Sequence, residues 1–194
     1  MEAKKLLEAL SVAERLKSIN RHCYTSEGER ESVADHSWRI AVMAMLLTDE
    51  FPDVDINKVI KMCLIHDMGE AFTGDIPVFK KTKEDENREY SRLLSWVKGL
   101  PEVIREEWLA LYREMDELVT VEAKLYKALD KLEAVIQHNE SDIKTWLPLE
   151  YDLQLEYGWE NVEFSEYMTE LRKIIAEDTR KKIMNARERR VKFL

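Results

Sequence analysis

Residues 63–77 read CLIHDMGEAFTGDIP, and the rest of the chain is best understood from this stretch. An apolar helical run ends here in the doublet His66-Asp67, and two more carboxylates, Glu70 and Asp75, follow it. The spacing of the apolar residues before the doublet predicts that Asp67 continues their buried face. A carboxylate on a buried face is costly to desolvate unless it is paired or bound to a cation. The doublet therefore predicts a binding partner.

The composition indicates one helical domain. The chain has 194 residues, of which 45% are hydrophobic, and this length supports one sizeable core better than two. Five glycines and four prolines are few, no low-complexity linker interrupts the chain, and helix-favouring residues are abundant. We therefore predict an all-α fold, a compact helical bundle, in a single domain of residues 1–194.

Charge and hydropathy exclude some classes of function. The net charge of -9 repels nucleic-acid backbones, so duplex binding is not expected. The basic tail, residues 181–194, is expected to be helical or frayed, and contact with an acidic partner is its alternative role. The longest apolar runs are too short to span a bilayer, and the amino terminus is unlike a signal peptide. A cytoplasmic protein without membrane contact is the expectation that follows.

Helical periodicity and capping residues predict where the helices lie. Residues Ser32–Asp35 are typical of a capping box, so a helix should begin there and end before Pro52. Gly69 suits the carboxyl-terminal turn of the helix that carries the doublet. Residues 20–30 and 141–161 are expected to be irregular. The other helices are expected at residues 3–19, 56–68, 85–98 and 102–118, from Thr120 onward, and from about Phe164 to the basic end.

Several polar residues outside the doublet stand out, and each has a structural alternative. His36 faces inward in the first turn of its helix, where a hydrogen-bonded core histidine is more common than a ligand. Asp130 lies beside an apolar stripe and, taken alone, would be a salt-bridged surface carboxylate. Arg21 can grip a phosphate through its planar guanidinium or can be salt-bridged. Residues 79–88 are either a solvated loop and helix start or a phosphate-facing lid.

Together these positions predict a metal site. Two imidazoles and two carboxylates come from three predicted helices: His36, His66, Asp67 and Asp130. Such a nitrogen and oxygen set suits one divalent ion among Mn, Co, Fe, Zn and Mg, and the lack of thiolates argues against a closed structural zinc site. The two cysteines are expected to be reduced and to bind no metal. A metal with open positions can polarise a phosphoryl oxygen and activate water.

Three blocks of sequence carry a resemblance to the HD superfamily of metal-dependent phosphohydrolases, whose pattern is H...HD...D. The blocks are Glu31–His36, His66–Pro77 and Glu122–Glu133, and in order and content they cover most of residues 12–180. An HD dipeptide alone is weak evidence, whereas the extended second block together with the other two is specific. The spacing is similar to that of the small HD proteins that include bacterial 5'-deoxynucleotidases and their eukaryotic HD-domain-containing relatives.

The resemblance implies a role for each candidate residue. It implies that Glu70 positions or activates the attacking water and that Asp75 contacts the substrate or supports the site. Arg21 matches the family's phosphate-binding arginine. The next position is commonly tryptophan in bacterial 5'-deoxynucleotidases and is associated there with favouring deoxyribose, but here it is His22, so the sugar preference stays open. The ligands implied for one divalent cation are His36, His66, Asp67 and Asp130.

The implied activity is hydrolysis of (deoxy)nucleoside 5'-monophosphates to nucleoside and phosphate, by in-line attack of water. Two alternatives remain open: an HD hydrolase of another small phosphate ester, such as a nucleoside triphosphate or a cyclic nucleotide, and a non-catalytic nucleotide- or metal-binding module. The presence of Glu70 argues against the module, since a pure binder needs no carboxylate that handles water. Relatives in the family are often homodimers, so a homodimer is expected by resemblance.

Overall fold

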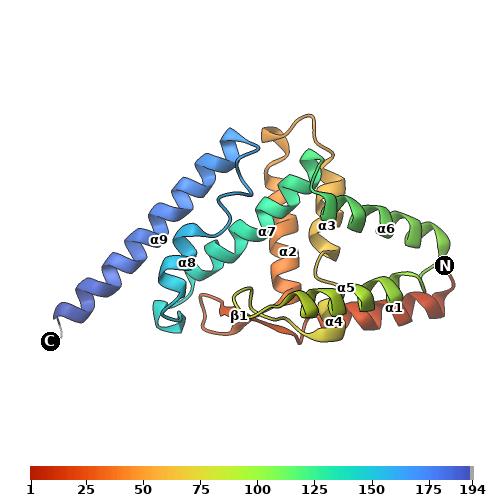
Figure 1. Ribbon diagram of the computed structural model, residues 1–194, viewed down its shortest axis with the longest axis horizontal. Coiled ribbons are helices and arrows are strands. Elements are labelled where there is room, and N and C mark those ends of the chain that lie inside the picture. Colours follow the sequence, from red (N-terminus) through yellow and green to blue (C-terminus); the bar gives the residue numbers. More distant parts are fainter. Residues whose placement is uncertain (193–194) are drawn as a thin grey trace.

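Helix α7, Val121–Glu140, runs through the middle of the fold, with the other helices arranged around it (Figure 1). The Thr120 hydroxyl accepts a hydrogen bond from a backbone amide of the first turn and caps this helix, as predicted. α7 contacts the helices α2, α3, α6 and α9 and the strand β1. Its fully buried leucines form the predicted apolar stripe: Leu125, Leu129 and Leu132.

The computed structural model describes the backbone of residues 1–192 and the side chains up to residue 188. Within these residues the predicted all-α fold is confirmed, apart from a two-stranded sheet. In chain order the elements around α7 are α1 Ala3–Arg15, β1 Asn20–Tyr24, β2 Arg30–Ser32, α2 Val33–Leu46, the 3-10 helix η1 Thr48–Glu50, α3 Ile56–Ile65, α4 Glu70–Thr73, α5 Lys83–Val97, α6 Glu102–Glu117, the 3-10 helix η2 Ile143–Thr145, α8 Glu150–Glu156 and α9 Glu166–Lys192.

The prediction that residues 20–30 are irregular is wrong in part, since only residues 25–29 lie outside the strands. Strands β1 and β2 form an antiparallel hairpin, and Gly28 lies in its turn with a φ of 87°. The hairpin has no regular alternation of apolar and polar residues, because its buried residues include Glu31 and Ser32 besides Cys23. Strand β1 contacts α7 and β2 contacts α2, so the hairpin packs against the centre of the fold.

The predicted capping box at the start of α2 is confirmed. The Ser32 hydroxyl accepts a hydrogen bond from the amide of Asp35, and the Asp35 carboxylate accepts one from the amide of Ser32. His36 consequently lies in the first turn of α2, where it is fully buried. The helix ends at Leu46 and the chain reaches Pro52 through η1, also as predicted.

The chain turns through His66 and Asp67 directly after α3. Gly69 lies in the turn after α3, as predicted, and its φ of -61° is one that any residue can adopt. A Cβ at this position would lie 2.7 Å from Cγ of Glu89 on α5, so the glycine is required by the close approach of that helix. Glu70 begins the short helix α4.

Helices α5 and α6 confirm the predictions at residues 85–98 and 102–118 to within two residues. The first helix ends at Arg15, earlier than predicted, because the chain must turn into β1. The prediction of an irregular stretch at residues 141–161 is wrong in part, since η2 and α8 lie within it. Elements of three and seven residues are too short to show a helical period in the sequence.

Helix α9 projects from the body of the molecule, and the two termini lie at opposite ends (Figure 1). The basic tail continues α9 as far as Lys192, and residues 193–194 lie outside the described residues. The cysteines Cys23 and Cys63 are free and buried. Among the described helices, none combines the length and the apolar character needed to cross a bilayer.

Candidate active site

Three parts of the fold bring imidazoles and carboxylates to one point. His36 comes from α2, His66 and Asp67 from the turn after α3, and Asp130 from α7. Ligand atoms of His36, His66 and Asp67 all lie within 4.8 Å of one another. Oδ1 of Asp130 is 3.4 Å from Nε2 of His36 and 3.9 Å from Nε2 of His66. The structure thus brings all four predicted metal-ligating residues together, and we call them the HD cluster.

Hydrogen bonds leave the same nitrogen free on both imidazoles of the HD cluster. Nδ1 of His36 lies 2.5 Å from the carboxylate of Glu133, and Nδ1 of His66 lies 2.8 Å from the carbonyl oxygen of Cys63. In the neutral form of each ring, these acceptors place the proton on Nδ1 and leave the lone pair on Nε2. Both Nε2 atoms are buried and lack a hydrogen-bond partner in the described part of the chain. Imidazole lone pairs that face carboxylates fit a divalent cation.

Charge is concentrated in the HD cluster, and the pKa values show it. Burial opposes the charged form of His36, but the neighbouring carboxylates of Asp130 and Glu133 outweigh this effect and raise its pKa to about 9. Burial would raise the pKa of Asp67, yet the neighbouring imidazole of His66 holds it well below its usual range. Protons bridge these groups when no cation does, so metal binding must displace them.

Asp130 lies at the edge of the HD cluster and also forms ion pairs with two lysines. Its Oδ2 is 3.0 Å from Nζ of Lys127 and 3.4 Å from Nζ of Lys131. Burial would raise the pKa of Asp130, but the charges of these lysines lower it well below its usual range. Asp130 is not a surface carboxylate, since it is only 9% exposed. Sequence reasoning missed both lysines, although Lys127 lies one turn before Asp130 on the same face of α7.

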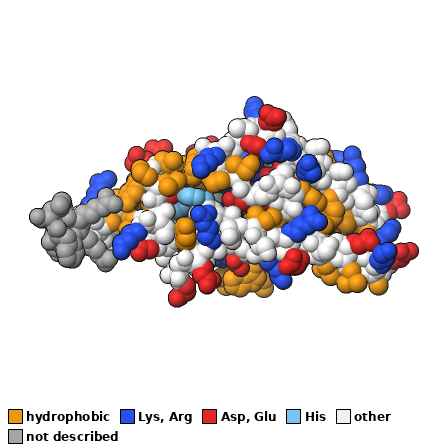
Figure 2. All heavy atoms as spheres, turned by 90° about the horizontal axis from the view of Figure 1, so that it is seen from below, with side chains coloured by type: hydrophobic (Ala, Val, Ile, Leu, Met, Phe, Trp, Pro, Cys, Tyr) orange, Lys and Arg blue, Asp and Glu red, His pale blue; other side chains and the backbone are white. Residues whose placement is uncertain are grey.

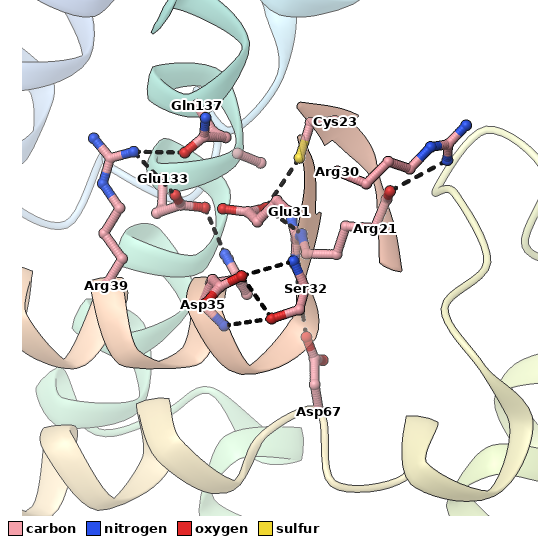
Figure 3. A network of polar contacts seen from close by, with 12 residues as sticks. Arg21, Cys23, Arg30, Glu31, Ser32, Asp35, Arg39, Asp67, Glu133 and Gln137 are labelled. Carbon is pink, nitrogen blue, oxygen red and sulfur yellow. Dashed lines mark hydrogen bonds and ion pairs between the residues drawn. The ribbon is translucent and has the colours of Figure 1, made fainter. Parts of the chain in front are cut away.

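Arg21 is salt-bridged and also reaches the HD cluster (Figure 3). Its Nε lies 3.0 Å from the carboxylate of Glu31, and its Nη1 lies 3.7 Å from Oδ2 of Asp67. Glu31 is 2% exposed and accepts a hydrogen bond from the thiol of Cys23. Burial and the nearby Glu133 raise the pKa of Glu31, against the opposite effect of Arg21. The hairpin therefore holds a guanidinium beside the cluster, where an anion can bind it.

Sequence reasoning also missed Glu133, which lies behind His36. Glu133 is fully buried, and one of its carboxylate oxygens contacts Nδ1 of His36 while the other lies 3.6 Å from the guanidinium of Arg39 (Figure 3). Such a carboxylate fixes the orientation and tautomer of a metal-binding imidazole. Its spacing in the sequence could have indicated this position, because Glu133 follows Asp130 by three residues and so lies on the same side of α7.

Glu70 and Asp75 line a cavity beside the HD cluster. Glu70 is 4% exposed, and its Oε2 has no hydrogen-bond partner among the described residues. Burial and the carboxylates of Asp67 and Asp75 raise the pKa of Glu70 to about 10, while burial also raises the pKa of Asp75. A divalent cation in the cluster would act in the opposite direction and favour the carboxylate of Glu70.

The cavity has a volume of about 260 Å³ and follows one face of α7. Figure 2 shows imidazole atoms in a hollow of the surface, with basic and apolar side chains around it. The helical rise places His138 roughly 12 Å from Asp130 along α7. One end of the cavity is therefore the charged HD cluster, and the other lies well away from it. The residues of α7 that line the cavity recur at helical spacing: Lys127, Asp130, Lys131, Ala134 and His138.

His22 lines the cavity on the side of α8. Its Nε2 lies 3.1 Å from Oε1 of Glu150, and Nε2 of His138 lies 3.1 Å from the same oxygen. The ring of His22 also meets the ring of Phe79 edge to face, with centroids 5.4 Å apart. Glu150 is 1% exposed, and its hydrogen bond with His138 lowers its pKa although burial would raise it. Sequence reasoning missed His138 and Glu150, which carry no local motif.

The mixed-charge stretch at residues 79–88 is a loop and helix start whose first residues also line the cavity. A capping box of Thr82 and Asp85 begins α5, as the structural alternative requires. Phe79 and Lys81 nevertheless line the cavity, and Nζ of Lys81 is held 2.8 Å from a carboxylate oxygen of Glu89. This stretch therefore forms a wall of the cavity before it enters the helix.

Comparisons with known proteins agree on one family. The HD domain family matches residues 13–172, a range that includes the whole HD cluster. Human 5'-deoxynucleotidase HDDC2 is 34% identical over 142 residues, which cover 71% of this chain and 69% of the human protein. The 5'-deoxynucleotidase hdd1 of Schizosaccharomyces pombe is 31% identical over 170 residues, which cover 78% of this chain and 85% of that protein.

A solved structure supports the same comparison. A predicted metal-dependent phosphohydrolase from Magnetospirillum magnetotacticum MS-1 has a TM-score of 0.78 at 27% identity, over 92% of this chain and 93% of that chain. The likeness extends over nearly the whole of both chains.

Proposed function

The chain belongs to the HD-domain family of metal-dependent phosphohydrolases, and we propose from this that it hydrolyses (deoxy)nucleoside 5'-monophosphates to nucleoside and phosphate. Its human and fission-yeast relatives are 5'-deoxynucleotidases, which supports this substrate class. The observation that carries the proposal is the pair of buried, unpartnered Nε2 atoms of His36 and His66, which face carboxylates next to Arg21.

We assign one divalent cation to the HD cluster. Two imidazoles and two carboxylates suit Mn, Co, Fe, Zn or Mg, and four protein ligands leave positions open in an octahedral ion. Such an ion polarises phosphoryl oxygens and lowers the pKa of water. Glu133 and the carbonyl of Cys63 would keep the two rings oriented toward it, because each accepts a hydrogen bond from an Nδ1.

Residues of the chain would bind the substrate and handle the attacking water. Arg21 would bind phosphate oxygens through its Nη atoms and offset the negative charge that develops on them. Glu70, with its unpartnered Oε2, would orient the attacking water and take a proton from it. Asp75 would hold the substrate from the segment after α4, and His22 would contact the sugar. The bond between phosphorus and the 5'-oxygen then breaks.

The proposal is tested by metal analysis of protein purified without added metal, followed by assays of the same sample with Mn, Co and Mg. On a panel of phosphate esters, we expect 5'-deoxynucleoside monophosphates to be hydrolysed with the highest kcat/KM. A preference for nucleoside triphosphates or cyclic nucleotides would contradict the proposed substrate. Binding of nucleotides without hydrolysis of any ester would instead indicate a non-catalytic module.

Glu133→Gln is expected to weaken metal affinity about 10- to 100-fold, because the neutral amide no longer holds Nδ1 of His36 as a carboxylate does. The dissociation constant, measured in competition with a chelator, checks this. The matched control is Glu140→Gln, since Glu140 contacts Arg39 as Glu133 does but lies at the exposed end of α7. Unchanged metal affinity in folded Glu133→Gln would contradict the orienting role.

We also propose that the protein is a homodimer in the cytoplasm. Large apolar side chains on α2 are exposed, among them Trp38 at 64% and Leu46 at 77%, and burying such residues favours self-association. The free, buried cysteines suit a reducing compartment. A net charge of -9 argues against a nucleic-acid partner. Sedimentation velocity measures the oligomeric state directly.

A further inference from the structure

The cavity wall formed by α8 contains a buried amide without a partner. Gln154 lies on α8, is 4% exposed and lines the cavity. Its Oε1 is buried and has no hydrogen-bond partner in the part of the chain that the structure describes. An unpaired buried acceptor is costly in free energy. Where a native site contains one, a ligand that donates the missing hydrogen bond explains it.

A buried arginine fixes the backbone that carries this amide. Arg172 of α9 is fully buried and donates hydrogen bonds of 3.0 Å to the carbonyl oxygens of Gln154 and Tyr157. Its guanidinium also lies over the ring of Trp159, at 4.7 Å from the centroid. A cation at the carboxyl end of a helix is favourable there. The end of α8 is therefore held in place before any ligand binds, which lowers the entropic cost of recognition.

Gln154 lines the same cavity as Arg21 and His22, so a nucleotide whose phosphate is bound at Arg21 can extend toward α8. A phosphate bound at Arg21 directs the sugar toward the adjacent His22, whose ring contacts Glu150 at the start of α8. Beyond the sugar, the cavity is bounded by α8 and by the aromatic rings of Phe79 and Tyr157. Aromatic faces next to a polar group are the surroundings that a flat heterocycle needs.

We infer that Gln154 recognises the nucleobase, by pairing its side-chain amide with the hydrogen-bonding edge of the base. The inference rests on the proposed function, because it takes the substrate to be a nucleotide. An amide presents a donor beside an acceptor, and a half-turn of the group exchanges the two. It can therefore pair with any of the four bases. Gln154 is expected to favour nucleotides over sugar phosphates that lack a base, with little preference among bases.

Gln154→Met tests this inference, since methionine keeps the length of the side chain and removes its hydrogen bonds. We expect KM for deoxyadenosine 5'-monophosphate to rise about 10-fold, as for the loss of a buried hydrogen bond, with kcat preserved. KM for 2-deoxyribose 5-phosphate, which has no base, should stay unchanged. Calorimetric titration with deoxyadenosine, which carries no phosphate, should show the same increase in Kd.

The matched control is Glu156→Gln, which changes an exposed side chain of α8 outside the cavity lining and should leave both KM values as in the wild type. If Gln154→Met raises KM equally for both substrates and lowers the Tm, the inference is overturned. Gln154 would then have a structural role next to Arg172. A wild-type protein with equal KM for both substrates would overturn it too, while its hydrolytic activity would uphold the proposed function. If neither ester is hydrolysed but Gln154→Met still weakens deoxyadenosine binding, base recognition stands and the proposed function fails.

Discussion

Asp67→Ala is expected to lose the bound metal and, with it, nearly all phosphohydrolase activity. Oδ2 of Asp67 lies 2.9 Å from Nε2 of His66 and 3.7 Å from Nη1 of Arg21, so one carboxylate joins the imidazoles to the arginine. Loss of an outer partner of a metal ligand costs about 10- to 100-fold in affinity, and loss of a ligand should exceed this. Metal content after purification and kcat/KM for a 5'-deoxynucleoside monophosphate measure the effect.

The same substitution removes a negative charge from a buried, crowded cluster, so the Tm must be measured alongside. Glu31 still pairs with Arg21 in this variant, and Asp130 still contacts both imidazoles, which leaves the positive groups compensated. The matched control is Asp53→Ala, at an exposed position in the turn before α3. A folded Asp67→Ala protein with full metal content and full activity would contradict the proposed metal site.

Part of the site could be predicted because a buried, unpaired charge is costly. A carboxylate on an apolar helical face requires a partner, and this requirement identifies Asp67 as a site residue from the sequence alone. The structure brings His36 and Asp130 to it from helices that are distant in sequence. Periodicity predicted those helices because each is long enough to show several turns. Which of these groups bind metal stays a prediction that the substitutions above address.

Outer contacts of the site could not be predicted, because they depend on how helices are rotated against one another. Glu133 and Lys127 have sequence contexts typical of solvated helix charges, yet one is fully buried and the other pairs with Asp130. The burial of Glu31 could not be predicted for another reason. The hairpin that carries it has no alternation of apolar and polar residues. The close approach of Glu89 on α5 to Gly69 is another contact from a different helix that the sequence does not indicate. Tertiary contacts of this kind leave no local pattern.

Glu70→Gln is expected to keep the metal and to lower kcat about 100- to 10,000-fold, the range attributed to a general acid or base. The HD cluster is complete without Glu70, whose Oε2 has no partner, so its loss should remove the group that handles water and spare the ligands. Metal content and kcat on the same preparation separate the two effects, and Glu70→Asp should recover part of kcat. Loss of metal in step with activity would instead make Glu70 a ligand. Unchanged kcat with full metal content would show that another group accepts the proton of the attacking water.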